Sequence, residues 1–219
     1  MGPQRGIVRL VVPSLFARLK DGTDSQTPLK TLNKKPKAII VTGRAGSGKS
    51  TLAKKLGKRL WMPVISRDEI KEGYVNTYDI KHDQLPCNTN ALVTDFFFDI
   101  VNQYLAGNIS IVIEAAFQHP VWEARMSRIL ELSHAWIVLC SCDDALAAER
   151  HLLRGLGDPD REFYHGNKRV AHYRETGEVL SPENYVAPKF NVPTIHVSTN
   201  GEYLPSLDEI VKQIQSSDA

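Results

Sequence analysis

The 219-residue sequence lacks the features that would place it in several special structural classes. It has only three cysteines, an odd number without metal-ligand spacing, so we expect reduced thiols and neither a disulfide framework nor a zinc site. No apolar run approaches the roughly eighteen residues that span a bilayer. The N-terminus also lacks the uninterrupted apolar core of a signal peptide. We therefore expect a cytoplasmic chain with no membrane partner.

An excess of charge of either sign is missing as well. Lys and Arg total 27 against 25 Asp and Glu, which leaves a formal net charge of +2. No strong overall field favours nucleic acid or an anionic membrane, although a local basic patch is still open. The 42% hydrophobic and 24% charged fractions are near globular averages. The length predicts one complete domain plus appendages.

The first 36 residues differ from the rest of the chain. Arg5, Arg9, Arg18 and Lys20 stand among the first twenty residues, which contain no acidic side chain. We expect 1–36 to be a basic, loosely ordered extension. An organelle transit peptide and a basic arm for a polyanionic partner are the alternatives.

From residue 37 onward, short apolar runs alternate with segments of helical periodicity. Buried strands are predicted at Ala38–Val41, Pro63–Ile65, Ile109–Ile113, Ala135–Cys140 and Thr194–Val197. Helices are predicted at Lys49–Leu60, Ala91–Tyr104, Val121–Leu132, Asp143–Leu153 and near Leu207–Ile214. This alternation predicts an α/β fold in which helices cover both faces of a parallel sheet, with the ligand at the carboxyl ends of the strands.

A phosphate-binding loop follows the first predicted strand. Gly43–Ser50 matches the pattern Gly-x-x-x-x-Gly-Lys-Ser/Thr in full. Lys49 is expected to bridge the β- and γ-phosphates of ATP, and Ser50 to bind Mg²⁺. Thr51 would support the loop or the α-phosphate. The predicted nucleotide-binding residues are Gly43, Arg44, Ala45, Gly46, Ser47, Gly48, Lys49, Ser50 and Thr51.

Two further groups follow later strands. Arg67 and Asp68 come at the end of the second strand, where Asp68 could accept a proton from an alcohol and Arg67 could bind an anionic part of the acceptor. Asp68 could instead cap the following helix. Glu114 ends the third strand, where many nucleotide hydrolases carry a magnesium-binding aspartate, and it could serve either the metal or the acceptor.

A switch GTPase is not indicated, because an Asn-Lys-x-Asp guanine-reading element is missing: Asn167-Lys168, for example, is followed by Arg169 and Val170. A mechanical ATPase would need more core strands than this length allows.

The sequence resembles a known family at several motifs: the loop, Ser66–Glu69, Val112–Phe117 and Glu149–Arg154. These look like the small P-loop kinases, a group that includes polynucleotide 5′-kinases, zeta-toxin-type sugar-nucleotide kinases and chloramphenicol phosphotransferases within the adenylate-kinase-like fold. The resemblance covers roughly 37–215. It implies a three-layer P-loop NTPase domain over 37–219, with a five-stranded parallel sheet and an arginine-bearing lid around 150–174.

The resemblance also implies residue roles. Asp68 would be the general base, and Arg150 and Arg154 would be lid arginines that stabilise the transferring phosphoryl group, together with Lys49. Phe117 and Trp122 fall where these kinases place substrate-binding loops, so they join Arg67 and Glu114 as acceptor-side candidates.

The expected function is Mg²⁺-dependent transfer of the ATP γ-phosphate to a hydroxyl of a small or nucleotide-type acceptor. One alternative is an ATP-binding regulatory or interaction module with little turnover. A polynucleotide 5′ end is an alternative acceptor, so nucleic acid is a possible but less favoured partner. The acceptor and the oligomeric state are not indicated.

Overall fold

The computed structural model describes residues 34–166, 168–181 and 184–216. The chain divides into two compact units, 1–34 and 35–219, and the first lies outside the described residues except for Lys34. The expectation for the extension over 1–36 therefore falls almost entirely outside the described part. Everything below concerns the second unit.

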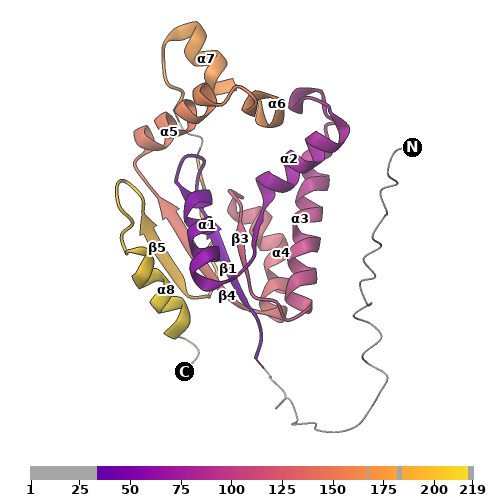
Figure 1. Ribbon diagram of the computed structural model, residues 1–219, viewed down its shortest axis with the longest axis vertical. Helices are drawn as coiled ribbons and strands as arrows, with labels where there is room; N and C mark the ends of the chain where they lie inside the picture. Colours follow the sequence, from indigo (N-terminus) through magenta and orange to yellow (C-terminus); the bar gives the residue numbers. More distant parts are fainter. Residues whose placement is uncertain (1–33, 167, 182–183, 217–219) are drawn as a thin grey trace, which may run out of the picture. The chain divides into compact units, whose positions relative to one another are not determined.

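The core of this unit is a five-stranded parallel sheet (Figure 1). Its strands, in the spatial order β2-β3-β1-β4-β5, are β1 (Lys37–Thr42), β2 (Val64–Ser66), β3 (Ile111–Glu114), β4 (His134–Ser141) and β5 (Thr194–Ser198). Val41 near the end of β1 lies opposite Glu114 on β3 and Val138 on β4. The prediction of five parallel strands is confirmed, and this register brings the ends of β1, β2 and β3 together.

Alternate side chains of the central strands enter two separate cores. Ile39 and Val41 pack on one face with the helices α1 (Lys49–Leu60) and α8 (Leu207–Ser216). Ala38 and Ile40 pack on the other with α3 (Thr89–Ala106) and α4 (His119–Leu132). Because both faces are covered, the central strands are apolar over 38–41 and 111–113, as their sequences predicted. No helix among the described residues is long and apolar enough to cross a membrane.

Five further elements complete the described part of the chain. They are α2 (Arg67–Tyr78), the 3₁₀ turn η2 (His82–Gln84), α5 (Asp144–Gly157), α6 (Arg161–His165) and α7 (Lys168–Thr176). In Figure 1, α6 lies beside the end of α2, and the two helices are in contact. We define the lid as residues 150–174, which comprise parts of α5 and α7 and all of α6. The sequence pattern did not show α6 and α7 as separate helices.

Trp122 belongs to the core and not to an acceptor pocket, which corrects the expectation from the sequence. Its side chain is 0% exposed and makes edge contacts with Phe98 and Phe117, at ring-centroid distances of 5.7 and 5.5 Å. The error has a physical reason: α4 begins at His119, so Trp122 already lies on the helix face that packs against the sheet.

This placement makes a stability prediction. Trp122→Ala should lower the free energy of unfolding by about 3–5 kcal/mol, because it leaves a large cavity in the core. Trp61→Ala is the matched control: Trp61 is 94% exposed, so its loss should change the stability by less than about 0.5 kcal/mol. Urea denaturation monitored by circular dichroism measures both. Equal, small effects would show that Trp122 is not a core residue.

Candidate active site

The phosphate-binding loop has the backbone that its glycines predict. Gly46 and Gly48 have φ angles of +83° and +77°, which side-chain-bearing residues rarely adopt. At Gly46 a Cβ would also lie 2.1 Å from the carbonyl oxygen of Ala147, so α5 leaves no room for a side chain. The helix α1 begins directly after the loop, at Lys49. Its N-terminal N–H groups therefore point toward the place where a phosphate would bind.

Neighbouring elements hold the loop in place. Arg44 forms an ion pair with Asp144 at the start of α5. The Thr199 hydroxyl, just after β5, donates a hydrogen bond of 2.8 Å to the Ser47 carbonyl oxygen. These contacts fix the loop against the ends of β4 and β5, so it is shaped by the sheet and not only by its own glycines.

Glu114 is the buried centre of the site. It ends β3, and only 3% of its side chain is exposed. Its Oε1 accepts a hydrogen bond of 3.1 Å from Ser50 Oγ and lies 3.7 Å from Lys49 Nζ, while its Oε2 accepts one of 2.7 Å from Ser66 Oγ. A buried carboxylate is costly unless it is paired and hydrogen-bonded, and here both oxygens are satisfied.

The surroundings of Glu114 fit a magnesium ion. The Ser50 hydroxyl and the Glu114 carboxylate offer two oxygen donors in contact with each other at the mouth of the loop, and Mg²⁺ prefers oxygen ligands, few of them from the protein when a nucleotide supplies the rest. Ser50 is the predicted metal ligand. Glu114 contacts the loop through Oε1 and the end of β2 through Oε2, so its role toward the metal or the acceptor stays a prediction.

Asp68 lies in the first turn of α2, whose N-cap is Ser66. The alternative role of Asp68 as a helix cap is therefore wrong. Its side chain is 46% exposed, and Oδ1 lies 3.5 Å from Arg67 Nη1. Partial burial by itself would raise the pKa of Asp68, but the charges of Lys49, His165, Arg67 and Arg161 outweigh it and hold the pKa below its usual value. The carboxylate is thus ionised at neutral pH and available as a proton acceptor.

The two residues on either side of Asp68, Arg67 and Glu69, contact different helices. Arg67 Nη2 donates a hydrogen bond of 2.9 Å to Asn90 Oδ1 on α3, which anchors the guanidinium beside Asp68. Glu69, by contrast, forms an ion pair of 2.9 Å with Lys54 on α1. Only one of the two adjacent carboxylates is therefore surrounded by the cations of the loop and the lid.

The lid arginines of the sequence prediction line a cavity beside the loop. Arg150 and Arg154 border about 710 Å³ together with Gly46, Thr51 and Tyr203. Burial and the nearby Arg161 lower the pKa of Arg154, a direction that an approaching phosphate would reverse. The structure thus brings Gly46, Gly48 and Thr51 of the predicted loop and both lid arginines to one cavity, large enough for a nucleotide.

Phe117 occupies an intermediate position. Its half-buried ring stacks on Phe98 at a centroid distance of 5.6 Å and packs against the core. Its role toward the acceptor stays a prediction.

The structure adds residues that the sequence did not single out. Lys71 Nζ lies 2.5 Å from His82 Nδ1, and burial lowers the pKa of Lys71 to about 8. His165 Nε2 on α6 lies 2.7 Å from Glu72 Oε1 on α2. The first contact joins α2 to η2, and the second joins the lid to α2. A lone His or Lys in a polar segment gives no sequence signal, because its partner is known only from the fold.

Comparison with known proteins places this site in a family. A family model described as an AAA domain matches residues 39–175, well over half of the chain. The chain belongs to this AAA domain family. Membership implies nucleotide binding at the phosphate-binding loop described above. No curated protein gives a significant match.

Solved structures share the fold at low sequence identity. A protein from Chloroflexus aurantiacus J-10-fl, provisionally described as a kinase, is 20% identical with a TM-score of 0.69, covering 84% of this chain and 98% of that one. The Mycobacterium tuberculosis APS kinase CysC is 17% identical with a TM-score of 0.51, covering 84% and 97%. The Pnkp1/Rnl/Hen1 RNA repair complex is 16% identical with a TM-score of 0.50, covering 74% and 52%. The chain therefore has a P-loop kinase-like fold.

The loop geometry makes a binding prediction. Gly46→Ala should weaken ATP binding by at least about tenfold, because the new Cβ needs both a strained φ and a shift of the Ala147 carbonyl. Isothermal titration with ATP measures the affinity. Gly73→Ala on α2 is the control: its added Cβ would meet nothing within 4 Å, so ATP affinity should not change. Unchanged ATP affinity in Gly46→Ala would contradict the position of the loop.

Proposed function

We propose that the protein is a Mg²⁺-dependent phosphotransferase that moves the γ-phosphate of ATP to a hydroxyl of a small or nucleotide-type acceptor. One observation carries the proposal. Lys49 of the phosphate-binding loop and Ser66 at the end of β2 contact the same Glu114 carboxylate, at 3.7 and 2.7 Å. Asp68 follows Ser66 by two residues, and the charge of Lys49 helps to lower its pKa. A base for an alcohol and a cation for a phosphate therefore share one site, as direct transfer between ATP and an acceptor requires.

In the proposed reaction Asp68 accepts the proton of the acceptor hydroxyl. The acceptor oxygen forms a bond to the γ-phosphorus, the bond from that phosphorus to the β,γ-bridging oxygen breaks, and ADP leaves. Lys49 and the lid arginines Arg150 and Arg154 offset the negative charge on the phosphates. Arg67 orients Asp68 and faces the acceptor side. Magnesium, when bound, would neutralise phosphate charge, with Ser50 and Glu114 as the residues that hold it.

The proposed role of Asp68 as the base can be tested by mutation. Asp68→Asn should lower kcat by about 10²–10⁴-fold, because it removes the proton acceptor, while ATP affinity stays unchanged. Glu69→Gln is the matched control: it alters the adjacent carboxylate, which pairs with Lys54, and should retain activity. Transfer of labelled γ-phosphate to a panel of hydroxyl acceptors measures the rate, and titration calorimetry measures ATP binding.

Other outcomes have distinct meanings. Loss of both ATP binding and transfer in Asp68→Asn would indicate a structural role for Asp68. ATP binding through Lys49 without acceptor-dependent ADP release would favour the regulatory-module alternative.

Two serine hydroxyls, of Ser50 and Ser66, donate hydrogen bonds to Glu114 and allow a test of the metal site. Ser50→Ala should raise the Mg²⁺ concentration for half-maximal transfer by about tenfold or more, because it removes a metal ligand. Ser66→Ala also removes a hydrogen bond to Glu114, but at Oε2 and not at Oε1, which contacts Ser50. It should therefore shift the Mg²⁺ concentration for half-maximal transfer much less. Equal shifts in the two variants would show that Ser50 acts only through Glu114.

A further inference from the structure

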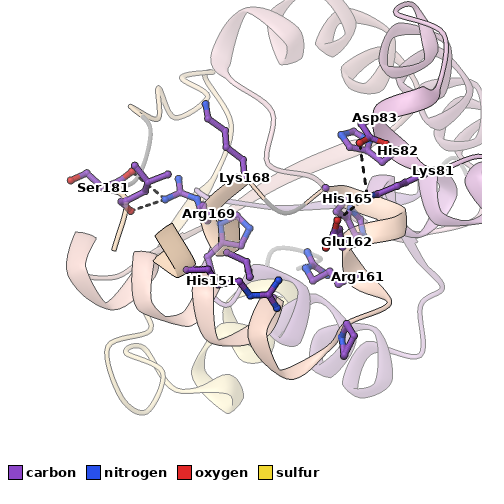
Figure 2. Close-up of a pocket in the computed structure, with 16 residues that line it drawn as sticks. Lys81, His82, Asp83, His151, Arg161, Glu162, His165, Lys168, Arg169 and Ser181 are labelled. Carbon is purple, nitrogen blue, oxygen red and sulfur yellow. Dashed lines mark hydrogen bonds and ion pairs between the residues drawn. The ribbon is translucent and has the colours of Figure 1, made fainter. Parts of the chain in front are cut away.

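A second cavity lies between the lid and the η2 segment that follows α2, apart from the nucleotide loop (Figure 2). We call it the cationic chamber. Its volume is about 700 Å³, within the range of small-molecule sites. None of the loop residues 43–51 lines it. Its basic lining residues come from four elements and their connections: Lys81, His82, His151, Arg161, His165, Lys168, Arg169 and Arg174.

The acidic side chains of the chamber do not balance these cations. Among the described residues, Asp83 and Glu162 are the carboxylates that line it, and Lys81 Nζ lies 3.9 Å from the first and 2.8 Å from the second. Arg169 Nη1 donates hydrogen bonds to the carbonyl oxygens of Leu180 and Ser181, at 2.7 and 3.2 Å. Within the described residues, Arg161, Lys168 and Arg174 form no ion pair with a carboxylate.

His151 is a buried histidine beside these cations. It lines the chamber from α5. Burial, together with the charges of Arg169, Arg161, Arg154 and Lys49, lowers its pKa to about 4. The imidazole is therefore neutral at pH 7, first because burial disfavours its charged form and second because the nearby cations repel a further positive charge. In Figure 2, Arg161 lies between His151 and the Glu162–His165 segment.

The walls of the chamber are joined by specific contacts. His165 on α6 pairs with Glu72 on α2, and Lys81 pairs with Glu162 across the same junction. Gly166, with φ +77°, lies so close to His82 that a Cβ there would be 3.0 Å from the ring. The chamber is therefore a formed volume between the η2 segment and the lid, which are distant in sequence, and not a basic patch on an open surface.

The chamber is also electrostatically connected to the proposed base. The charges of His165 and Arg161, which line it, help to lower the pKa of Asp68. The contact of His165 with Glu72 gives a geometric link, because Glu72 lies four residues after Asp68 on the same face of α2. A molecule in the chamber would therefore lie near the helix that carries the proposed base.

We infer that the acceptor is a small molecule that carries a phosphate ester, and that its phosphate binds in the cationic chamber to Arg161, Lys168 and Arg169. The assignment of this molecule as the acceptor rests on the proposed function. The anion site in the chamber does not depend on it. Arginine binds phosphate through paired charge-assisted hydrogen bonds. The limited volume favours a small acceptor over a polynucleotide.

The first experiment tests the anion site without catalysis. Inorganic phosphate is titrated into the full chain with the loop saturated by ADP, while NMR follows the imidazole resonances of His82, His151 and His165. We expect saturable shifts and a rise of the His151 pKa, because a bound anion offsets the neighbouring arginines. Arg161→Gln should weaken phosphate binding by about tenfold or more, and Arg161→Lys should keep part of it.

The control is Arg128→Gln on α4, because Arg128 is exposed and pairs with Glu131 outside the chamber. It should leave the phosphate affinity unchanged. The inference is overturned if phosphate does not shift the chamber histidines, or if Arg161→Gln and Arg128→Gln bind phosphate equally well.

The second experiment tests the acceptor with matched pairs: glucose and glucose 6-phosphate, ribose and ribose 5-phosphate, and an oligonucleotide with a 5′-hydroxyl. We expect transfer to a phosphorylated member of a pair, with Arg161→Gln raising the KM of that acceptor about tenfold and leaving the KM of ATP unchanged. Equal transfer to neutral sugars would overturn the inference and keep the kinase proposal. Transfer only to the oligonucleotide would overturn the small-molecule assignment.

The two proposals can fail separately. Chamber binding of phosphate that depends on Arg161, without transfer to any acceptor, supports the anion site and argues against the kinase reaction.

Discussion

The buried Glu114 carboxylate is the interaction on which the arrangement of this site depends. It contacts Ser50 and Lys49 at the end of the loop and Ser66 at the end of β2. A charge with 3% exposure needs all three partners, so it ties the strand ends of the sheet to the start of α1 and the start of α2. The position of Asp68, two residues after Ser66, follows from the same contact.

The sheet order explains why two cavities form. In the order β2-β3-β1-β4-β5 the loop leaves the central strand, α2 leaves β2 on one side, and the lid leaves β4 on the other. The lid can therefore contact both the loop and α2. Arg150 and Arg154 on α5 face the loop cavity, whereas α6 reaches α2 through His165 and Glu72. One segment thus borders the nucleotide side and the proposed acceptor side.

The sequence predicted the parts of the fold that rest on local pattern. All five strands and α1 were found because continuous apolar runs and a 3.6-residue period require burial on one or both faces, and Gly43–Ser50 was found because few residue types allow that backbone. α6 and α7 were missed as separate helices because short polar helices bury few apolar side chains. Trp122 was misassigned because position after a strand does not tell which helix face a residue occupies.

The net charge of +2 shows why composition could not reveal the chamber. Charges cancel over the whole chain, but the fold gathers Arg161, Lys168, Arg169 and Arg174 at one cavity and directs most carboxylates elsewhere. Such crowding is unfavourable by itself, since like charges repel in a partly desolvated volume. The pairs His165–Glu72 and Lys81–Glu162 hold the walls together against this repulsion. An anion in the chamber would relieve it, so binding there and contact between lid and α2 should stabilise each other.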